Sequence, residues 1–158
     1  MTTSETVAPA SFDMLRAMVA GDVFGPDDQG YDQARRAWEL AADQRPAVVV
    51  FPESVVDVVR AVRFARSQGL RIAPQATGHG ALPLELLEEA MLRTSRMRRV
   101  DVFPAIRTAR AEAGAQWEDV TVPAGEYGLG ALAGTSKRRR DGIHAGRWLV
   151  LAGSPPTA

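Results

Sequence analysis

Hydrophobic and polar positions along the chain predict a strand, a helix and a second strand in its first half. Residues 47–51 read Ala-Val-Val-Val-Phe, a continuous apolar run typical of a strand buried on both faces. The spacing of Ser54 and Asp57 predicts the start of a helix that runs to Gln68. Residues 70–73, Leu-Arg-Ile-Ala, predict a second short strand. Because two strands joined by one helix usually lie parallel, the pattern predicts a small parallel βαβ subdomain.

The apolar side chains of the predicted helix fall largely on one helical face, which we expect to be buried. These residues are Val55, Val58, Val59, Val62 and Phe64, and the remaining positions include Arg60, Arg63 and Arg66. Gly69 follows as the expected stop, since glycine readily adopts the left-handed conformation that ends many helices.

The residues before the subdomain predict less regular structure. Residues 1–20 are expected to form an N-terminal arm and a short helix, the helix covering residues 12–20 with Ser11 as its cap. Residues 22–30 are rich in Gly, Asp and Pro and predict a loop. Residues 31–40 predict a short helical turn.

The second half of the chain predicts antiparallel structure. Residues 97–103 and 106–113, separated by Pro104, have the pattern of two strands of a hairpin with one solvent-exposed face. A helix over 115–127 and a short strand over 129–133 follow. A parallel subdomain followed by the start of an antiparallel sheet with helices gives an α+β fold class.

Composition narrows the possible chemistry. The chain of 158 residues is 46% hydrophobic and 24% charged, and its 19 basic residues balance 19 acidic ones. This predicts one soluble domain with neither nucleic acid nor membrane as partner, and without a recognisable signal we expect a cytoplasmic location. The absence of cysteine excludes disulfides and thiolate metal sites, and only His79 and His144 could supply imidazole ligands. The chemistry must therefore come from a cofactor or from carboxylates.

A glycine-rich loop directly follows the second predicted strand. Glycines on both sides of a histidine allow positive φ and close backbone approach, and successive N–H groups there can bind a diphosphate. A tight turn with a surface histidine explains the same residues more often, because Gly-x-Gly is a weak signal. The residues of this 75–80 loop are Gln75, Ala76, Thr77, Gly78, His79 and Gly80.

Residues 47–80 as a whole resemble the start of the PCMH-type FAD-binding domain of FAD-linked oxidases. These enzymes belong to the vanillyl-alcohol-oxidase superfamily, and the resemblance is to the berberine-bridge-enzyme-like branch. Further matching runs are G-Y-D-Q-A-R-R-A-W, L-R-T-S-R-M-R-R-V-D-V, T-A-R-A-E-A-G-A-Q-W-E-D-V and G-L-G-A-L-A-G-T-S. Together they place residues 21–136 as the N-terminal part of such a domain.

The resemblance implies FAD as cofactor. In the family this loop holds the FAD diphosphate and its histidine is often bonded covalently to the flavin, which would make His79 the attachment point. It also implies that Gly134, Thr135 and Ser136 lie near the cofactor. The implied function is part of an FAD-dependent oxidoreductase that oxidises an alcohol, sugar or similar small molecule and reduces O₂. The alternatives are a truncated, non-catalytic remnant and an unrelated α+β anion-binding module.

The chain departs from the family after Ser136. There the family continues with a glycine-rich run of the type V-G-x-x-G-Y-T-L-G-G-G, whereas this chain reads K-R-R-R-D-G-I-H-A-G-R-W-L-V-L. Codons able to encode this stretch, read one base later, permit P-S-V-G-V-T-G-Y-T-L-G-G-G-L-S-W. The match predicts a frameshift near Ser136 and a non-family tail over 137–158. A basic tail for an anionic partner and an ordinary solvated terminus are the alternatives.

Overall fold

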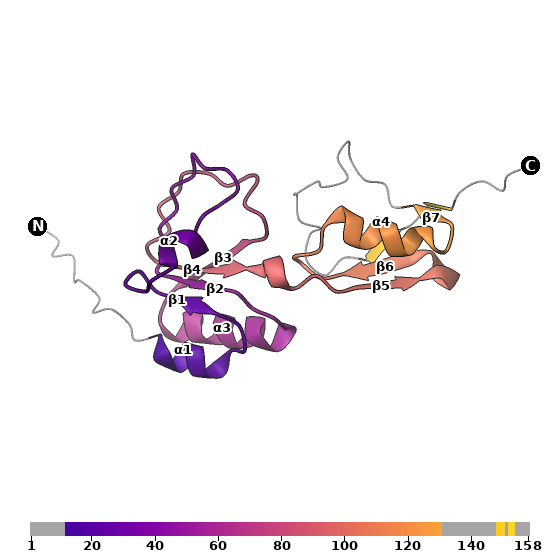
Figure 1. The fold of residues 1–158 in the computed structure, drawn as a ribbon. Coiled ribbons are helices and arrows are strands. Elements are labelled where there is room, and N and C mark those ends of the chain that lie inside the picture. The colour runs from indigo at the N-terminus through magenta and orange to yellow at the C-terminus, as the bar shows by residue number, and fades with distance from the viewer. Residues whose placement is uncertain (1–11, 131–147, 151, 154–158) are drawn as a thin grey trace, which may run out of the picture.

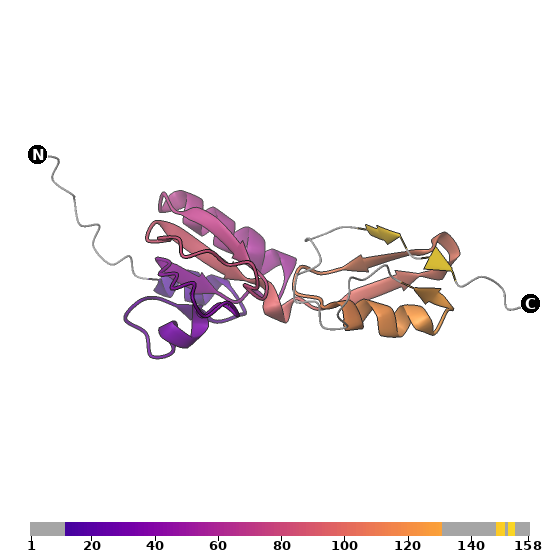
Figure 2. The same ribbon diagram turned by 90° about the horizontal axis from the view of Figure 1, so that it is seen from above.

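The first lobe of the protein is built on a four-stranded sheet with strand order β1-β2-β4-β3 (Figures 1 and 2). The computed structural model describes residues 12–130, 148–150 and 152–153. The sheet contains β1 (Val23–Phe24), β2 (Val48–Val50), β3 (Arg71–Gln75) and β4 (Glu89–Arg93). The parallel part of the predicted fold class is therefore confirmed.

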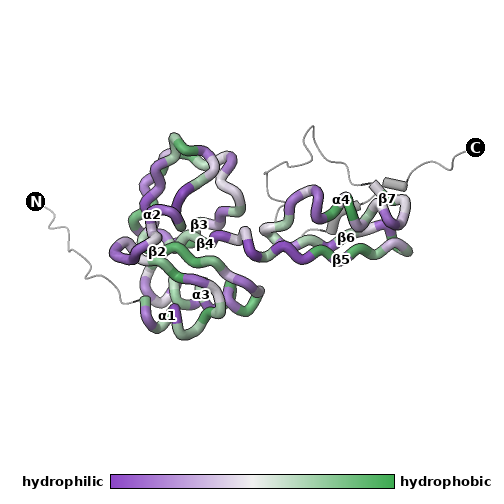
Figure 3. The backbone as a smooth tube through the Cα atoms, viewed as in Figure 1, coloured by the Kyte–Doolittle hydropathy of each residue, from purple (hydrophilic) through white to green (hydrophobic). Residues whose placement is uncertain are grey.

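Helices cover both faces of this sheet. One face packs against α1 (Asp13–Met18) and α3 (Val55–Ser67), and the other against α2 (Tyr31–Ala34) (Figure 1). The three valines of β2 are fully buried because Val48 and Val50 face one layer and Val49 the other. Their hydropathy stands out along the tube in Figure 3, and it explains why a continuous apolar run forms this strand.

The predicted βαβ unit needs one correction. β2 and β3 are parallel as expected, but β4 lies between them and pairs with both. Residues 84–88, just before β4, read L-E-L-L-E, a run with no strand alternation. The strand forms because Ala90, Met91 and Leu92 enter the core. The segment predicted as a loop over 22–30 also contains β1, whose strand character comes from antiparallel pairing with β2.

The ends of α3 match the predicted signals with one difference. The Ser54 hydroxyl accepts a hydrogen bond from the Asp57 N–H at 3.2 Å. The Asp57 carboxylate does not complete a reciprocal capping box. It accepts instead from the N–H groups of Glu53 at 3.0 Å and Ala20 at 3.1 Å, which ties α3 to the chain after α1. Gly69 has φ +70° and ends the helix as predicted.

The prediction of the buried face of α3 is wrong in most positions. Val55, Val59 and Val62 are exposed, and Val58 is only partly buried. The helix instead buries the residues Asp57, Ala61, Phe64 and Ala65. Small alanine side chains let the helix approach the sheet closely, so the packed face is the narrow one rather than the one with most valines.

The predicted helix boundaries before the sheet also shift. α1 covers fewer residues than the predicted 12–20, and its N-cap is Phe12, without a side-chain cap, where the sequence predicted Ser11. α2 covers only the first turn of the predicted 31–40 stretch. Residues 1–11 lie outside the part that the structure describes.

The second lobe is antiparallel, as predicted. β5 (Val100–Phe103) and β6 (Thr108–Ala111) form the hairpin, joined by the 3₁₀ turn Pro104–Ile106. α4 (Trp117–Gly125), with Pro123 inside it, packs Val120 and Ala124 against the hairpin. A 3₁₀ turn, Thr94–Arg96, leads from β4 into this lobe.

Short strands complete the second lobe. β7 (Leu129–Gly130) pairs with β9 (Ala152–Gly153), and β8 (Trp148–Val150) pairs with β6, both antiparallel. Within the described ranges, no helix has the length and apolar character needed to cross a membrane.

Candidate functional site

The 75–80 loop lies at the carboxyl edge of the parallel strands. It begins at Gln75, the last residue of β3, and Gln75 pairs in register with Arg93, the last residue of β4. Phe51 follows β2 at the same edge. Ligands of open parallel sheets bind outside the carboxyl ends of the strands, so the loop occupies the position where a ligand is expected.

Backbone hydrogen bonds hold the loop against residues 37–39. The N–H of Trp38 donates to the carbonyl of Thr77 at 3.1 Å, and the N–H of Glu39 donates to the carbonyl of Gly78 at 3.3 Å. In the described part of the chain, the N–H groups of Gly78 and Gly80 have no protein acceptor. The loop therefore uses its carbonyls for its own support and leaves donors for an anion.

The two glycines of the loop have different roles. Gly78 has φ +73°, and a Cβ there would lie 2.9 Å from the Ala37 Cβ and 3.0 Å from the Gln75 Cδ. Gly80 lacks positive φ, and a Cβ there would meet no atom within 4 Å. Only Gly78 thus meets the sequence-based expectation of positive φ. What its missing Cβ permits is close packing of the loop on Ala37, rather than approach of a ligand.

His79 is exposed and stacks on an aromatic side chain from the segment behind the loop. Its imidazole lies parallel to the indole of Trp38, with ring centroids 4.5 Å apart and planes 5° apart. Trp38 itself is 48% exposed. The stack fixes the plane of the imidazole while its outer face remains accessible.

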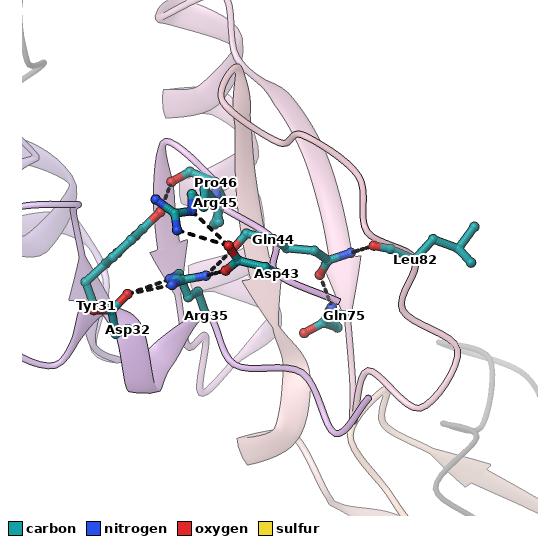
Figure 4. A network of polar contacts seen from close by, with 9 residues as sticks. All are labelled: Tyr31, Asp32, Arg35, Asp43, Gln44, Arg45, Pro46, Gln75 and Leu82. Carbon is teal, nitrogen blue, oxygen red and sulfur yellow. Dashed lines mark hydrogen bonds and ion pairs between the residues drawn. The ribbon is translucent and has the colours of Figure 1, made fainter. Parts of the chain in front are cut away.

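Three side chains form a one-way series of hydrogen bonds behind the loop. Nη1 of Arg93 donates to Oε1 of Gln75 at 2.8 Å, and Nε2 of Gln75 donates to Oε1 of Gln44 at 2.7 Å. Nε2 of the buried Gln44 then donates to the carbonyl of Leu82 at 2.9 Å (Figure 4). The series links Gln75, where the loop begins, to Leu82, just after the loop ends, through Gln44. It therefore holds the two ends of the loop in place.

Gln44 is in turn held by a charged network on α2 and the segment that follows it (Figure 4). The Arg35 guanidinium donates to Asp43 and Asp32, and it donates to the Gln44 carbonyl at 2.9 Å. The bonds from Arg35 and Arg45 lower the pKa of Asp43 below its ordinary value. Asp43 therefore stays ionised at neutral pH, and the network keeps Gln44 in place.

The Tyr31 hydroxyl donates to the carbonyl of Pro46, and burial raises its pKa. The same part of the chain lines an open pocket of about 570 Å³, to which the 75–80 loop contributes no residue. The pocket adjoins the loop through Ala37 and Glu39, which line the pocket and contact Gly78. The candidate ligand surface is the loop itself.

The structure brings the predicted residues Gln75, Ala76, Thr77, Gly78, His79 and Gly80 together in this loop. Gly134, Thr135 and Ser136 lie outside the described residues. Sequence reasoning missed Ala37, Trp38, Gln44 and Arg93. Their positions in the chain carry no spacing signal relative to the loop, and only pairing of β3 with β4 and packing of 37–44 reveal them. Among the described residues, no group of acidic or histidine side chains could hold a metal ion.

Comparison with known proteins shows related sequences. The FAD binding domain family matches residues 46–136, more than half of the chain. (R)-6-hydroxynicotine oxidase of Paenarthrobacter nicotinovorans is 29% identical over 117 residues, which are 73% of this chain and 26% of that protein. An FAD-linked oxidoreductase of Dictyostelium discoideum matches with the same identity and coverage. The chain thus spans about a quarter of the length of these curated relatives.

Solved structures show the same fold. The 6-hydroxy-D-nicotine oxidase of Arthrobacter nicotinovorans matches with a TM-score of 0.67 at 28% identity, over 79% of this chain and 27% of its own. BBE-like 1 of Physcomitrella patens gives a TM-score of 0.70 at 23% identity, over 84% and 29%. Glucooligosaccharide oxidase of Acremonium strictum, whose FAD is 6-S-cysteinyl and 8α-N1-histidyl, gives 0.67 at 24% identity, over 82% and 28%. The last two similarities concern the fold alone. The family match over residues 46–136 leads to the assignment: the chain belongs to the FAD binding domain family found in FAD-linked oxidoreductases.

Proposed function

We propose that the 75–80 loop binds the diphosphate of FAD, and that the chain does so as the N-terminal part of an FAD-dependent oxidoreductase. The oxidoreductase oxidises an alcohol, sugar or similar small molecule and transfers the electrons to O₂. The observation that carries the proposal is the pair of N–H groups, from Gly78 and Gly80, that have no acceptor in the described chain. They lie at the sheet edge where ligands bind.

The residues present fit a flavin dinucleotide. The loop carbonyls of Thr77 and Gly78 are already bonded to the protein, so the loop presents donors rather than acceptors to an anion. Bound FAD would supply the redox chemistry, since it accepts two electrons from an organic substrate. This chain would hold the diphosphate end of FAD and orient the rest of it.

We further propose that His79 is the covalent attachment point. Its imidazole is exposed and lies parallel to the Trp38 indole, and a neutral imidazole nitrogen is the nucleophile that would bond the 8α carbon of the flavin. The histidyl FAD of glucooligosaccharide oxidase is a related precedent for this bond. The described chain holds the loop firmly, as attachment at a defined carbon requires.

Titration calorimetry of the 158-residue chain with FAD and with ADP tests binding. We expect both ligands to bind, because both carry a diphosphate. Acid precipitation followed by mass spectrometry of the His79 peptide tests attachment. Flavin found only in the supernatant would rule out the covalent bond and leave diphosphate binding standing.

A frameshift near Ser136 stays part of the proposal. The family match ends at residue 136, and codons able to encode the residues that follow, read one base later, permit the expected glycine-rich run. The competing function is a remnant that binds FAD weakly and catalyses nothing. Sequencing the DNA around and beyond the Ser136 codon decides between a frameshift and a genuine tail.

A further inference from the structure

Two arginines lie against the same aromatic ring at the carboxyl edge of the sheet, and only one of them is paired with carboxylates. The guanidinium carbons of Arg93 and Arg96 lie 5.8 Å and 5.3 Å from the centre of the Phe51 ring. Arg96 donates to Glu53 at 3.0 Å and to Asp22. Within the described ranges, Arg93 has no carboxylate partner.

The hydrogen bonds of Arg93 leave its charge uncompensated. Nη1 donates to two neutral oxygens, the carbonyl of Arg36 at 2.7 Å and Oε1 of Gln75 at 2.8 Å. Nε is buried and has no acceptor among the described residues. Burial lowers the pKa of Arg93, although an arginine stays protonated at any physiological pH. A half-buried cation with an unused donor is unfavourable unless an anion completes its environment.

The position of Arg93 indicates which anion this is. Arg93 and Gln75 are register partners on adjacent strands, so the guanidinium lies beside the start of the 75–80 loop. The loop offers two N–H groups, of Gly78 and Gly80, that have no acceptor among the residues the structure describes, and its six residues include neither lysine nor arginine. A diphosphate carries about two negative charges at neutral pH, and neutral N–H groups alone do not balance them.

We propose that Arg93 supplies the counter-charge for the FAD diphosphate bound at the 75–80 loop. This proposal rests on the proposed function, and it gives the diphosphate a cationic partner from β4. Arg93 also positions the loop through Gln75. The two roles can be separated by the choice of ligand. Loss of the Arg93 charge should weaken only ligands that contain phosphate, whereas loss of its positioning role should weaken every ligand of the loop, riboflavin included.

The experiment measures affinity of the 158-residue chain by calorimetry for FAD, ADP, inorganic pyrophosphate and riboflavin, which lacks phosphate. Arg93→Met removes the charge, Arg93→Lys keeps it, and Arg96→Met is the matched control on the same ring. We expect Arg93→Met to weaken FAD, ADP and pyrophosphate by roughly tenfold or more, and to leave riboflavin unchanged. It should also flatten the dependence of ADP affinity on salt.

Arg93→Lys should recover part of the ADP affinity, and Arg96→Met should lower the melting temperature while keeping wild-type ADP affinity. Circular dichroism checks folding, and Arg93→Gln replaces Arg93→Met if that variant does not fold. Unchanged ADP affinity in the charge-removing variant would overturn the proposal while the proposed function stands, as would an equal loss for riboflavin. A wild-type chain that binds neither FAD nor ADP would overturn both.

Discussion

The imidazole of His79 lies flat on the indole of Trp38, with ring centroids 4.5 Å apart. The two residues come from segments that are also joined by a hydrogen bond from the Trp38 N–H to the Thr77 carbonyl. Trp38 therefore supports the loop in two ways, through its backbone and through its ring. Substitution of the side chain separates the two, because it leaves the backbone hydrogen bond in place.

We expect Trp38→Ala to lower the fraction of bound flavin that is covalently attached. An aromatic pair contributes about 0.5–1.5 kcal/mol, so the fraction competent for attachment should fall roughly threefold to tenfold. Trp38→Phe keeps a ring and should retain most of the attachment. The measurement is flavin fluorescence of the denatured protein band against total flavin bound before denaturation. If Trp38→Ala attached the same fraction of its bound flavin as wild type, the stack of His79 on Trp38 would have no role in attachment.

Gly78→Ala should lower stability and FAD affinity, whereas Gly80→Ala should leave stability nearly unchanged. At Gly78 a Cβ meets Ala37 at 2.9 Å on a backbone with φ +73°, so we expect the free energy of unfolding to fall by about 1–3 kcal/mol and FAD binding to weaken. Gly78→Val should abolish FAD binding more completely than His79→Ala. At Gly80 the space is open, so the change should stay within about 0.5 kcal/mol. Urea denaturation and FAD titration measure both variants, and equal effects would contradict the packing role of Gly78.

Asp57 should make stability depend on acidic pH. Burial alone would raise its pKa, but hydrogen bonds from the N–H groups of Ala20 and Glu53 and from the Ser54 side chain lower it overall. Its ionised form is therefore favoured in the folded state. This contribution is complete above about pH 5 and is lost as the pH falls below about 4, through the lowered pKa.

Asp57→Asn should lower the free energy of unfolding by about 1–3 kcal/mol at pH 7, and the difference from wild type should shrink at pH 3. Asp27→Asn, at an exposed position, is the control and should change it by less than about 0.5 kcal/mol. Urea denaturation at the two pH values measures both. An Asp57→Asn effect of constant size across this range would argue against an ionised, hydrogen-bonded carboxylate.

Gln75→Glu should break the series of hydrogen bonds from Arg93 through Gln75 to Gln44 behind the loop. The new carboxylate can pair with Arg93 but cannot donate to Oε1 of the buried Gln44. We expect faster amide hydrogen exchange at Ala81 and roughly tenfold weaker ADP binding, because the charge of Arg93 is neutralised from within. Unchanged ADP affinity would contradict both the series and the role of Arg93.

The 158 residues on their own should show no oxidase turnover, because the candidate site that they form would hold only the diphosphate end of a flavin and they span about a quarter of the length of their relatives. Shifting the frame at Ser136 and expressing the downstream sequence should give a protein that produces peroxide. A panel of sugars and alcohols, assayed for peroxide with both proteins side by side, tests this. Flavin-dependent turnover by the shorter chain would show that the missing part is dispensable.

Local patterns predicted the elements whose residues decide their own structure. The fully apolar β2, the Ser54 cap and the Pro104 turn of the hairpin were identified because each signal lies within a few residues. β4 and β1 were missed because their strand character comes from their neighbours in the sheet. The buried face of α3 was misassigned because the valines outnumber the alanines that pack.

In the candidate site, too, the residues with a local sequence signal were predicted and those brought in by strand pairing or packing were missed. The 75–80 loop was predicted from its glycines, its histidine and its family resemblance. Arg93 could not be found, since it reaches the loop only through the pairing of β4 with β3. Trp38 lies far from His79 in the sequence, and no pattern in either segment indicates that their rings touch.

Because β4 lies between β2 and β3, the sheet that supports the loop can form only after β4 has been synthesised. β2 and β3 share no neighbour until residues 89–93 have been synthesised, although the 75–80 loop is complete before that. A nascent chain that stops short of β4 leaves the facing edges of β2 and β3 unpaired and lacks Arg93. Binding of the FAD diphosphate with Arg93, as proposed above, would therefore require insertion of β4 first.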